Sequence, residues 1–121
     1  MIKKFIAFDV EENGKVLIIS PQGSEHGFRH ETVHHEYNAL FRQLEDQKID
    51  SLVVNFGRVD YLGSIMLGVI IRLSSRVTNM GGRVVICCCS EQMMEVLMSQ
   101  NLHKLWAHFD EQDVAIASFA E

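Results

Sequence analysis

One serine, Ser64, stands where its hydroxyl could carry chemistry. It follows Gly63 within Arg58–Gly68, at the point where a helical pattern begins. A phosphate there would bring about −1.5 to −2 charges, and free N–H groups with the helix dipole would favour them by roughly 0.3–2 kcal/mol. The structural alternative is that Ser64 is an N-cap, with its hydroxyl accepting a backbone N–H bond worth about 1 kcal/mol.

Histidines and cysteines offer weaker candidate sites. His30 and His34 are four residues apart, but a metal site would need a third ligand, and the apolar stripe of that segment belongs to other residues. We therefore interpret these two, with His26 and His35, as solvated. The consecutive residues Cys87–Cys89 should alternate faces of a strand, so they cannot all bind one metal and are best interpreted as small apolar side chains.

Catalytic motifs are absent from the sequence. It contains no Gly-x-Ser-x-Gly, no Cys-x-x-Cys and no glycine-rich phosphate loop with a lysine. No His or Lys lies near Ser64 in sequence to activate its hydroxyl. We predict that the protein is not an enzyme and holds neither a metal nor a cofactor.

The elements around Ser64 follow from hydrophobic periodicity. Leu52–Phe56 is a short apolar run typical of a strand buried on both faces. Apolar residues then recur at helical spacing from Met66 to Met80, and Gly81-Gly82 is expected to end that helix with a left-handed cap. Arg83–Cys87 forms the next strand, which predicts a right-handed parallel crossover.

The rest of the chain extends this α/β pattern. Phe5–Phe8 and Val16–Ile19 flank Asn13-Gly14, which predicts a hairpin. Pro21–Gly27 has the composition of a loop, and a helix should follow over 33–44 and lead back to the central strand. The expected C-terminal features are an N-cap at Ser90, a packed apolar group of Leu102, Leu105 and Trp106, and a last helix capped by Asp110 and docked through Val114, Ala117 and Phe119.

Composition limits the classes of function. The 121 residues, 47% of them hydrophobic, predict a single domain over 1–121 with one core. A net charge of −5 gives no basic footprint for nucleic acid. We find no signal peptide and no apolar run of the roughly 20 residues that a membrane span needs. We expect a cytoplasmic protein.

The segment Asn55–Gly82, "NFGRVDYLGSIMLGVIIRLSSRVTNMGG", resembles the core of the STAS domain of anti-sigma factor antagonists. That family has a hydrophobic strand, an Asp-Ser-Ser-Gly-Leu-Gly-like turn, a helix, Gly-Gly and a strand, and the order of elements is similar over roughly residues 5–119. Ser64 falls on the serine that is phosphorylated in the family, and Leu67-Gly68 match. Gly63 stands where the family usually has Asp, and Ile65-Met66 stand where it often has Ser and Gly.

The resemblance implies a STAS-like mixed sheet of four or five strands with about four helices packed on it. It also implies a module of bacterial signalling that binds a kinase-type anti-sigma factor and is released when that kinase phosphorylates Ser64. The expected docking residues are Tyr61, Gly63, Ser64, Ile65, Met66 and Gly68, supported by the loop Gly23–Gly27. At least one of Ile65 and Met66 should be exposed, because only one can easily face the core.

Two other interpretations stay open. Gly63 and the apolar Ile65-Met66 pair favour a scaffold or regulatory subunit that binds its partner constitutively and is never phosphorylated. A small-molecule or nucleotide sensor has only the loop Gly23–Gly27 to support it. The sequence leaves the oligomeric state open, a homodimer included.

Overall fold

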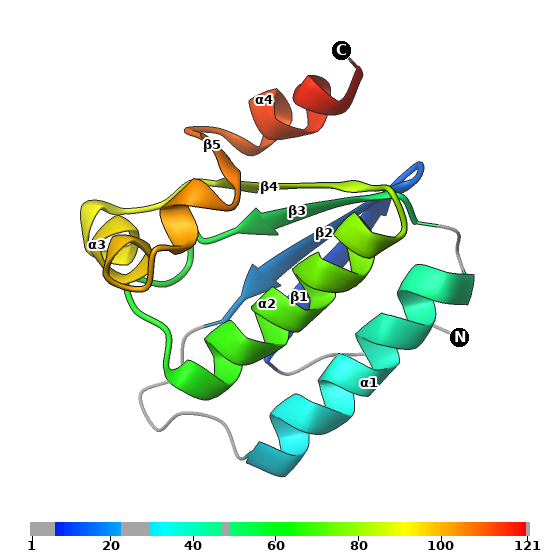
Figure 1. Cartoon of the computed structure of the whole chain (residues 1–121), viewed down its shortest axis with the longest axis horizontal. Helices are drawn as coiled ribbons and strands as arrows, with labels where there is room; N and C mark the ends of the chain where they lie inside the picture. The colour runs from blue at the N-terminus through cyan, green and yellow to red at the C-terminus, as the bar shows by residue number, and fades with distance from the viewer. Residues whose placement is uncertain (1–6, 23–29, 47–48, 121) are drawn as a thin grey trace.

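The protein folds as a mixed five-stranded sheet with helices on both of its faces (Figure 1). The computed structural model describes residues 7–22, 30–46 and 49–120. The strands are β1 (Phe8–Asn13), β2 (Val16–Pro21), β3 (Ser51–Asn55), β4 (Arg83–Cys87) and β5 (Ala107–Phe109). The helices are α1 (His30–Asp46), α2 (Ser64–Asn79), α3 (Glu91–Ser99) and α4 (Gln112–Ala117), with 3-10 turns η1 (Leu102–Lys104) and η2 (Ser118–Ala120).

The strand order is β1-β2-β3-β4-β5, with β1 antiparallel to β2 and the other neighbours parallel. This confirms the α/β fold and the central position of β3, which two crossover connections share. It also places the carboxyl ends of β2, β3, β4 and β5 along one edge of the sheet, because parallel strands point the same way. The turn that leads to Ser64 starts at this edge, directly after β3.

The N-terminal hairpin is confirmed, and its first strand extends further along the chain than predicted. Asn13 pairs with Val16 across a two-residue turn in which Gly14 has φ +62°. The described strand occupies Phe8–Asn13, so it includes Glu11 and Glu12, while Phe5 and Ile6 of the predicted Phe5–Phe8 lie outside the described residues. Both carboxylates are exposed on this edge strand. Charged side chains on an edge strand do not interrupt the backbone hydrogen bonds of the sheet.

Two apolar clusters cover the two faces of the sheet. The larger one joins the sheet to α1, α2 and α3 and is anchored by Leu52 and Val54 of β3 and by Ile70 and Leu73 of α2. The smaller one lies on the opposite face, where Ala115 of α4 packs among Ile18, Val53, Val85 and Cys87. Figure 1 shows α1 and α2 side by side on one face and α4 beyond β4 and β5 on the other. Successive side chains of the buried strands point to opposite faces of the sheet, so the same strands contribute residues to both clusters.

Two arginines of α2 fix its position against α1. The guanidinium of Arg72 lies 5.0 Å from the centre of the Tyr37 ring, and that of Arg76 lies 4.9 Å from the centre of the Phe41 ring. Arg76 Nη2 also lies 3.3 Å from Glu45 Oε1. Because each pair is spaced by four residues, successive turns of the two helices meet in register. These contacts fix the direction of helix α2 and therefore the position of Ser64 at its start.

The predicted left-handed end of α2 is confirmed. Gly81 has φ +87°, and its N–H donates to the Thr78 carbonyl at 3.0 Å. The N–H of Gly82 donates to the Val77 carbonyl at 2.8 Å. These two bonds make a Schellman motif, which satisfies carbonyls that the helix leaves free.

The C-terminal region departs from the sequence-based expectations in three places. Helix α4 has Glu111 rather than Asp110 at its N-cap position, without a side-chain capping bond, and its fully buried residue is Ala115, while Val114 is 49% exposed. Packing of Ala115 against the sheet sets the phase of the helix, which turns Val114 outward. Leu105 is 63% exposed, although Leu102 and Trp106 are buried as expected, because it follows η1 on the solvent side.

The N-cap prediction for α3 is confirmed. The Ser90 hydroxyl accepts the backbone N–H of Met93 at 3.1 Å. Met93 and Leu97 are fully buried, and Met94 is half-buried. The capping serine therefore starts a helix whose apolar face completes the larger cluster.

Candidate functional site

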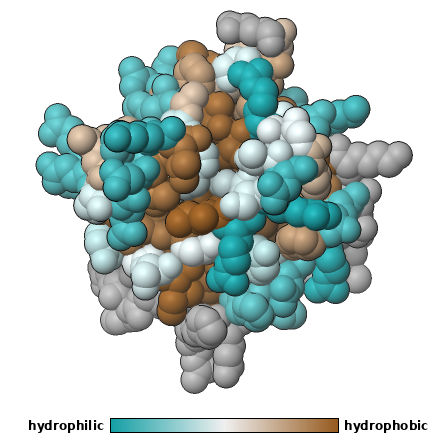
Figure 2. Space-filling view, viewed as in Figure 1, coloured by the Kyte–Doolittle hydropathy of each residue, from teal (hydrophilic) through white to brown (hydrophobic). Residues whose placement is uncertain are grey.

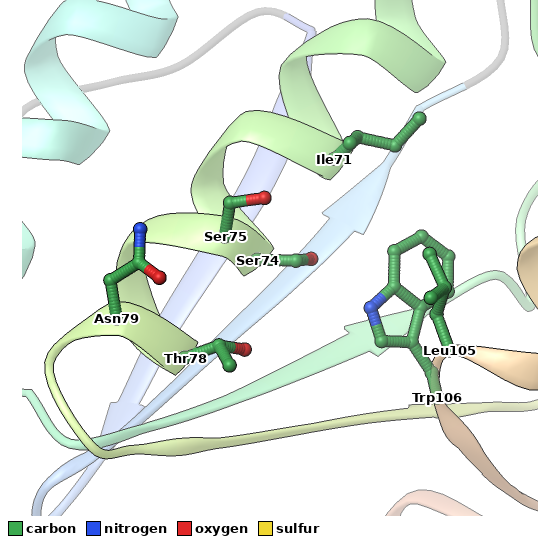
Figure 3. Close-up of a pocket in the computed structure, with 7 residues that line it drawn as sticks. All are labelled: Ile71, Ser74, Ser75, Thr78, Asn79, Leu105 and Trp106. Carbon is green, nitrogen blue, oxygen red and sulfur yellow. The ribbon is translucent and has the colours of Figure 1, made fainter.

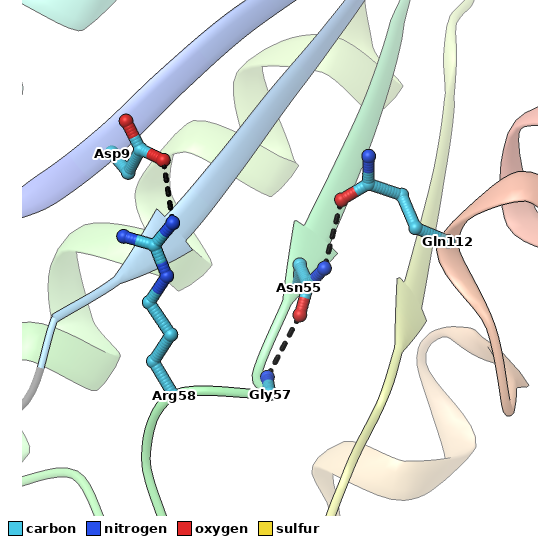
Figure 4. A network of polar contacts seen from close by, with 5 residues as sticks. All are labelled: Asp9, Asn55, Gly57, Arg58 and Gln112. Carbon is cyan, nitrogen blue, oxygen red and sulfur yellow. Dashed lines mark hydrogen bonds and ion pairs between the residues drawn. The ribbon is translucent and has the colours of Figure 1, made fainter.

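The turn between β3 and Ser64 is held by the side chain of Asn55, the last residue of β3. Its Oδ1 accepts the backbone N–H of Gly57 at 2.8 Å, which is the geometry of an Asx turn. Its Nδ2 donates to Gln112 Oε1 of α4, also at 2.8 Å. Figure 4 shows Asn55 between these two partners. One amide thus connects the start of the turn to a helix on the smaller-cluster face.

An ion pair connects the same turn to the first strand. Arg58 Nη2 lies 2.8 Å from Asp9 Oδ2, and both side chains are about half exposed (Figure 4). An exposed pair of this kind contributes at most about 1 kcal/mol. It orients the turn more than it stabilises the fold. Neither this pair nor the Asn55–Gln112 bond was predicted from the sequence, although Asn55 is the one polar residue within the apolar run Leu52–Phe56.

Ser64 is the first residue of α2, so the structural alternative, in which Ser64 is the N-cap, is wrong. The N-cap residue is Gly63, with extended backbone angles of φ −73° and ψ 168° and no side chain to form a capping bond. The Gly63 carbonyl accepts the N–H of Leu67 at 3.1 Å, the first bond of the helix. The Ser64 side chain is exposed. Its hydroxyl is therefore presented to solvent at the positive end of a 16-residue helix.

Apolar side chains lie on the surface around Ser64. Tyr61 is 69% exposed and Ile65 is 43% exposed, whereas Met66 is buried. This confirms the prediction that at least one of the Ile65-Met66 pair is exposed, and it places Met66 in the core instead of on the docking surface. Gly68, one turn beyond Ser64, is half-buried and leaves that part of the helix without a side chain.

Of the predicted docking residues, the structure therefore brings a subset together on the surface. We call the set of Tyr61, Gly63, Ser64, Ile65 and Gly68 the Ser64 face. The loop Gly23–Gly27, which was expected to support it, lies outside the described residues. Exposed aromatic and aliphatic side chains of this kind can contact the surface of another protein. Phosphorylation of the hydroxyl between them would add negative charge to such a contact.

Gly63 has open space where a side chain would project. A Cβ at this position would meet no heavy atom within 4 Å, and the backbone angles suit any residue. Nothing in the described fold therefore requires glycine here. Where the family that the sequence resembles usually has an aspartate, this chain therefore presents no carboxylate on the surface at position 63.

The three cysteines do not follow the strand alternation predicted for them. Strand β4 ends at Cys87, and Cys88 has φ +63°, so its side chain packs with Cys87 in the smaller cluster. Cys89 instead packs against the larger cluster. Burial, with the hydrogen bond and charge of Cys88, raises the pKa of Cys87 far above its usual range. Burial, with the charge of Cys88, raises the pKa of Cys89 to about 11.

The histidine positions give no metal centre within the described part of the chain. His34 and His35 are exposed on α1, and the His34 ring stacks on Tyr37 with 6.3 Å between ring centres. His26 lies outside the described residues, as does the side chain of His30. Among the described residues no group of three potential ligands comes together, and none of the helices there is long and apolar enough to cross a membrane.

A hollow of about 290 Å³ lies beside the second half of α2. Trp106 and Leu105 face the helix across it, and Ile71, Ser75 and Thr78 line the opposite wall (Figure 3). Figure 2, in the orientation of Figure 1, shows hydrophobic residues across the middle of this face of the molecule and hydrophilic residues around them. The α2 residues that line the hollow begin at Ile71, two helical turns after Ser64 and three residues after Gly68.

Comparison with models of protein families identifies one family for this chain. The model of the STAS domain matches residues 7–113, which is most of the chain. Among solved structures, the TM1081 protein of Thermotoga maritima superposes with a TM-score of 0.80 at 19% identity, covering 97% of this chain and 91% of that one.

Two further structures have names that describe a role. SpoIIAA from Bacillus, named as an anti-sigma factor antagonist, superposes in its phosphorylated form with a TM-score of 0.72 at 18% identity, covering 93% of this chain and 99% of that one. A chain from the stressosome, named as a signal integration and transduction hub, gives 0.71 at 13% identity, covering 87% and 90%. At these identities the likeness concerns the fold.

Proposed function

The chain belongs to the STAS domain family, and we propose that it is a protein-interaction module of bacterial signalling that is switched by phosphorylation of Ser64. In its unmodified form the Ser64 face docks on a kinase-type anti-sigma factor. Phosphorylation of Ser64 by that kinase releases the complex. The observation that carries the proposal is an exposed serine at the first position of a fixed helix, surrounded by exposed Tyr61 and Ile65.

The helix N-terminus supports a phosphate without loss of the fold. The first turn of α2 contains no acidic residue, so the dipole and free N–H groups favour the added charge by roughly 0.3–2 kcal/mol. The effect on a docked partner has the opposite sign. A dianion buried against Tyr61 and Ile65 without a counter-charge would lose its hydration, which costs several kcal/mol.

The experiment measures binding of the cognate kinase-type anti-sigma factor to three variants. We expect Ser64→Ala to bind like the unmodified wild type and Ser64→Asp to bind more weakly. Ser75→Asp is the matched control, because Ser75 is also exposed on α2 but lies three turns away, and it should bind like wild type. Equal binding of Ser64→Ala and Ser64→Asp would show that the switch is not at this residue.

The phosphorylation itself is tested by intact mass and phosphosite mapping of protein purified from its native cells. We expect one phosphate that appears and disappears with growth condition and is missing in a Ser64→Ala strain. A chain that never carries phosphate would remove the switch from the proposal.

A constitutive scaffold is the second candidate. It is favoured by Gly63, which leaves Ser64 without the neighbouring carboxylate of the family pattern, and by the exposed apolar surface of Ile65. The likeness in fold to a chain of the stressosome, which is named as a signal integration and transduction hub, also supports this candidate. For a scaffold we expect a stable partner in a pull-down with unchanged yield from wild type and Ser64→Asp, whereas a switch would lower the yield with Ser64→Asp.

A further inference from the structure

Cys88 holds a backbone conformation that side-chain-bearing residues seldom adopt. Its φ is +63°, in the left-handed region, directly after β4. That conformation costs a non-glycine residue roughly 1–2 kcal/mol, and residues held in it concentrate at functional sites. Here it returns the Cys88 side chain to the side of the sheet on which Cys87 is buried, so two adjacent thiols share one apolar cluster.

The peptide unit between these cysteines is bonded on both sides to other elements. The Cys87 carbonyl accepts the N–H of Phe56 at 3.0 Å, and the N–H of Cys88 donates to the Phe109 carbonyl of β5 at 3.1 Å. Cys88 also packs beneath Gly57, since a Cβ placed on Gly57 would lie 3.3 Å from Cys88 Cβ. This single peptide therefore joins the start of the Ser64 turn to the edge strand.

The three thiols differ in how they can react. The pKa values of Cys87 and Cys89 are both raised, so each supplies less thiolate, the reactive form, than an ordinary cysteine. Cys87 is fully buried, whereas Cys88 is half-buried. A reagent from solvent therefore meets Cys88 before it meets Cys87, while both side chains pack in the same cluster.

We propose that Cys87 and Cys88 form a reversible vicinal disulfide that rearranges the start of the Ser64 turn. The Cys88 thiolate attacks one sulfur of a low-molecular-weight disulfide, which forms a mixed disulfide and releases one small thiolate. The Cys87 thiol then attacks the Cys88 sulfur, and its proton passes to the small thiolate that is displaced, which leaves as the second small thiol. Two protein thiols lose two electrons in total, and the small disulfide gains them to give two thiols.

The geometry of adjacent residues makes this disulfide a conformational device. Neighbouring Cα atoms are about 3.8 Å apart across a trans peptide, below the roughly 4.4–6.8 Å that disulfides usually span. Closing the ring therefore distorts the Cys87–Cys88 peptide and its bonds to Phe56 and Phe109. The same strain makes the bond easy to reduce, so it reverses when the thiol pool becomes reducing. This inference does not depend on phosphorylation of Ser64.

Intact mass and peptide mapping of the full chain in glutathione redox buffers test the bond. We expect the wild type to lose two hydrogen masses, with the bond mapped to Cys87–Cys88, and to recover them on reduction. Cys87→Ser should stop at one added glutathionyl group on Cys88, and Cys88→Ser should form no internal disulfide. Cys89→Ser is the matched control and should behave as wild type. A disulfide in Cys88→Ser, a Cys88–Cys89 bond, or no disulfide in the wild type would overturn the proposal.

Amide hydrogen exchange of the reduced and oxidised forms tests the rearrangement. We expect the N–H groups of Phe56 and Cys88 to lose protection on oxidation, because the Phe56 N–H then loses the Cys87 carbonyl and the Cys88 N–H loses the Phe109 carbonyl. The N–H of Gly82, bonded to Val77 at the far end of α2, is the internal control and should keep its protection. Unchanged protection of Phe56 and Cys88 in the oxidised form would refute the coupling to the turn.

Discussion

The side-chain amide of Asn55 donates to Gln112 Oε1 at 2.8 Å while its oxygen accepts the N–H of Gly57 at the same distance. The last residue of β3 thus connects α4 on one side with the start of the Ser64 turn on the other. Positions at which one side chain satisfies two elements are sensitive, because removing it leaves both partners without a bond.

Removal of the Asn55 side chain should destabilise the fold more than removal of its partner. We expect Asn55→Ala to lower the free energy of unfolding by about 1–3 kcal/mol and Gln112→Ala by about 0.5–1.5 kcal/mol, because only the first leaves the Gly57 N–H without its bond. Urea unfolding of both variants and of the double variant gives the coupling between the two residues. Equal losses from the two single variants would contradict the role given to the Gly57 bond.

A capping side chain at Gly63 should stabilise α2. An aspartate or serine there meets no steric obstacle and can accept an N–H of the first turn, so Gly63→Asp and Gly63→Ser should raise the free energy of unfolding by roughly a few tenths of a kcal/mol. Gly63→Ala is the control, since it adds a Cβ but no acceptor. Stabilisation by alanine equal to that by aspartate would show that capping is not the cause.

A negative charge at position 64 should itself be favourable in the free protein. We expect Ser64→Asp to be more stable than the neutral Ser64→Asn by about 0.3–1 kcal/mol at low ionic strength, because the charge interacts with the N-terminal end of the helix dipole. Thr78, exposed in the last turn of α2, provides the reverse case, and Thr78→Asp should be less stable than Thr78→Asn. Thermal unfolding measures both differences, which should shrink when salt is added.

Gly82 should be intolerant of any side chain. A Cβ there would lie 2.1 Å from the Asp50 carbonyl oxygen and 2.7 Å from Val77 Cγ1, so Gly82→Ala should cost about 1–3 kcal/mol or more through overpacking. Gly68→Ala is the comparison: its Cβ would approach only Arg72 Nη2, at 3.9 Å. Inside a helix that change should stabilise by about 0.5–1 kcal/mol. Denaturant midpoints with opposite shifts would confirm both predictions, and equal shifts would contradict them.

Stability should fall at alkaline pH in part through Cys89. Its pKa is raised from 9.0 to about 11 in the folded state, first by burial, so the unfolded chain releases this proton at lower pH than the folded one. The contribution is fully present below pH 9 and is lost as the pH rises towards 11. Under reducing conditions, urea midpoints of wild type should therefore decrease more over this interval than those of Cys89→Ser. Parallel decreases would contradict a buried, protonated Cys89.

Much of the fold could be predicted from local patterns. The apolar run at β3, the helical spacing within α2 and the Gly81-Gly82 stop specify a strand, a helix and a strand, because each of these patterns depends on neighbours within one or two turns. The Asn13-Gly14 hairpin and the Ser90 cap are local in the same sense. The position of Ser64 at the start of α2 and the exposure of at least one of Ile65 and Met66 followed from this reasoning as well, and the structure shows that the exposed residue is Ile65.

Features that depend on distant contacts could not be predicted in this way. Strand β5 has three residues, two of them exposed, and it exists because β4 provides a ladder for it to pair with. The phase of α4, which buries Ala115 and exposes Val114, is set by packing on β4. Asn55 met Gln112 across 57 residues of sequence, a separation at which periodicity carries no information.

The sequence by itself determined the order of elements, the buried central strand and the place of Ser64 at a helix start, because hydrophobic periodicity and turn chemistry act over a few residues. Only the tertiary structure decided that Gly63 occupies the N-cap position, that Asn55 joins the turn to α4, and that Cys88 lies on the same side of the sheet as Cys87. Each of these is fixed by backbone angles and partners that form when strands and helices pack, so no local pattern encodes them.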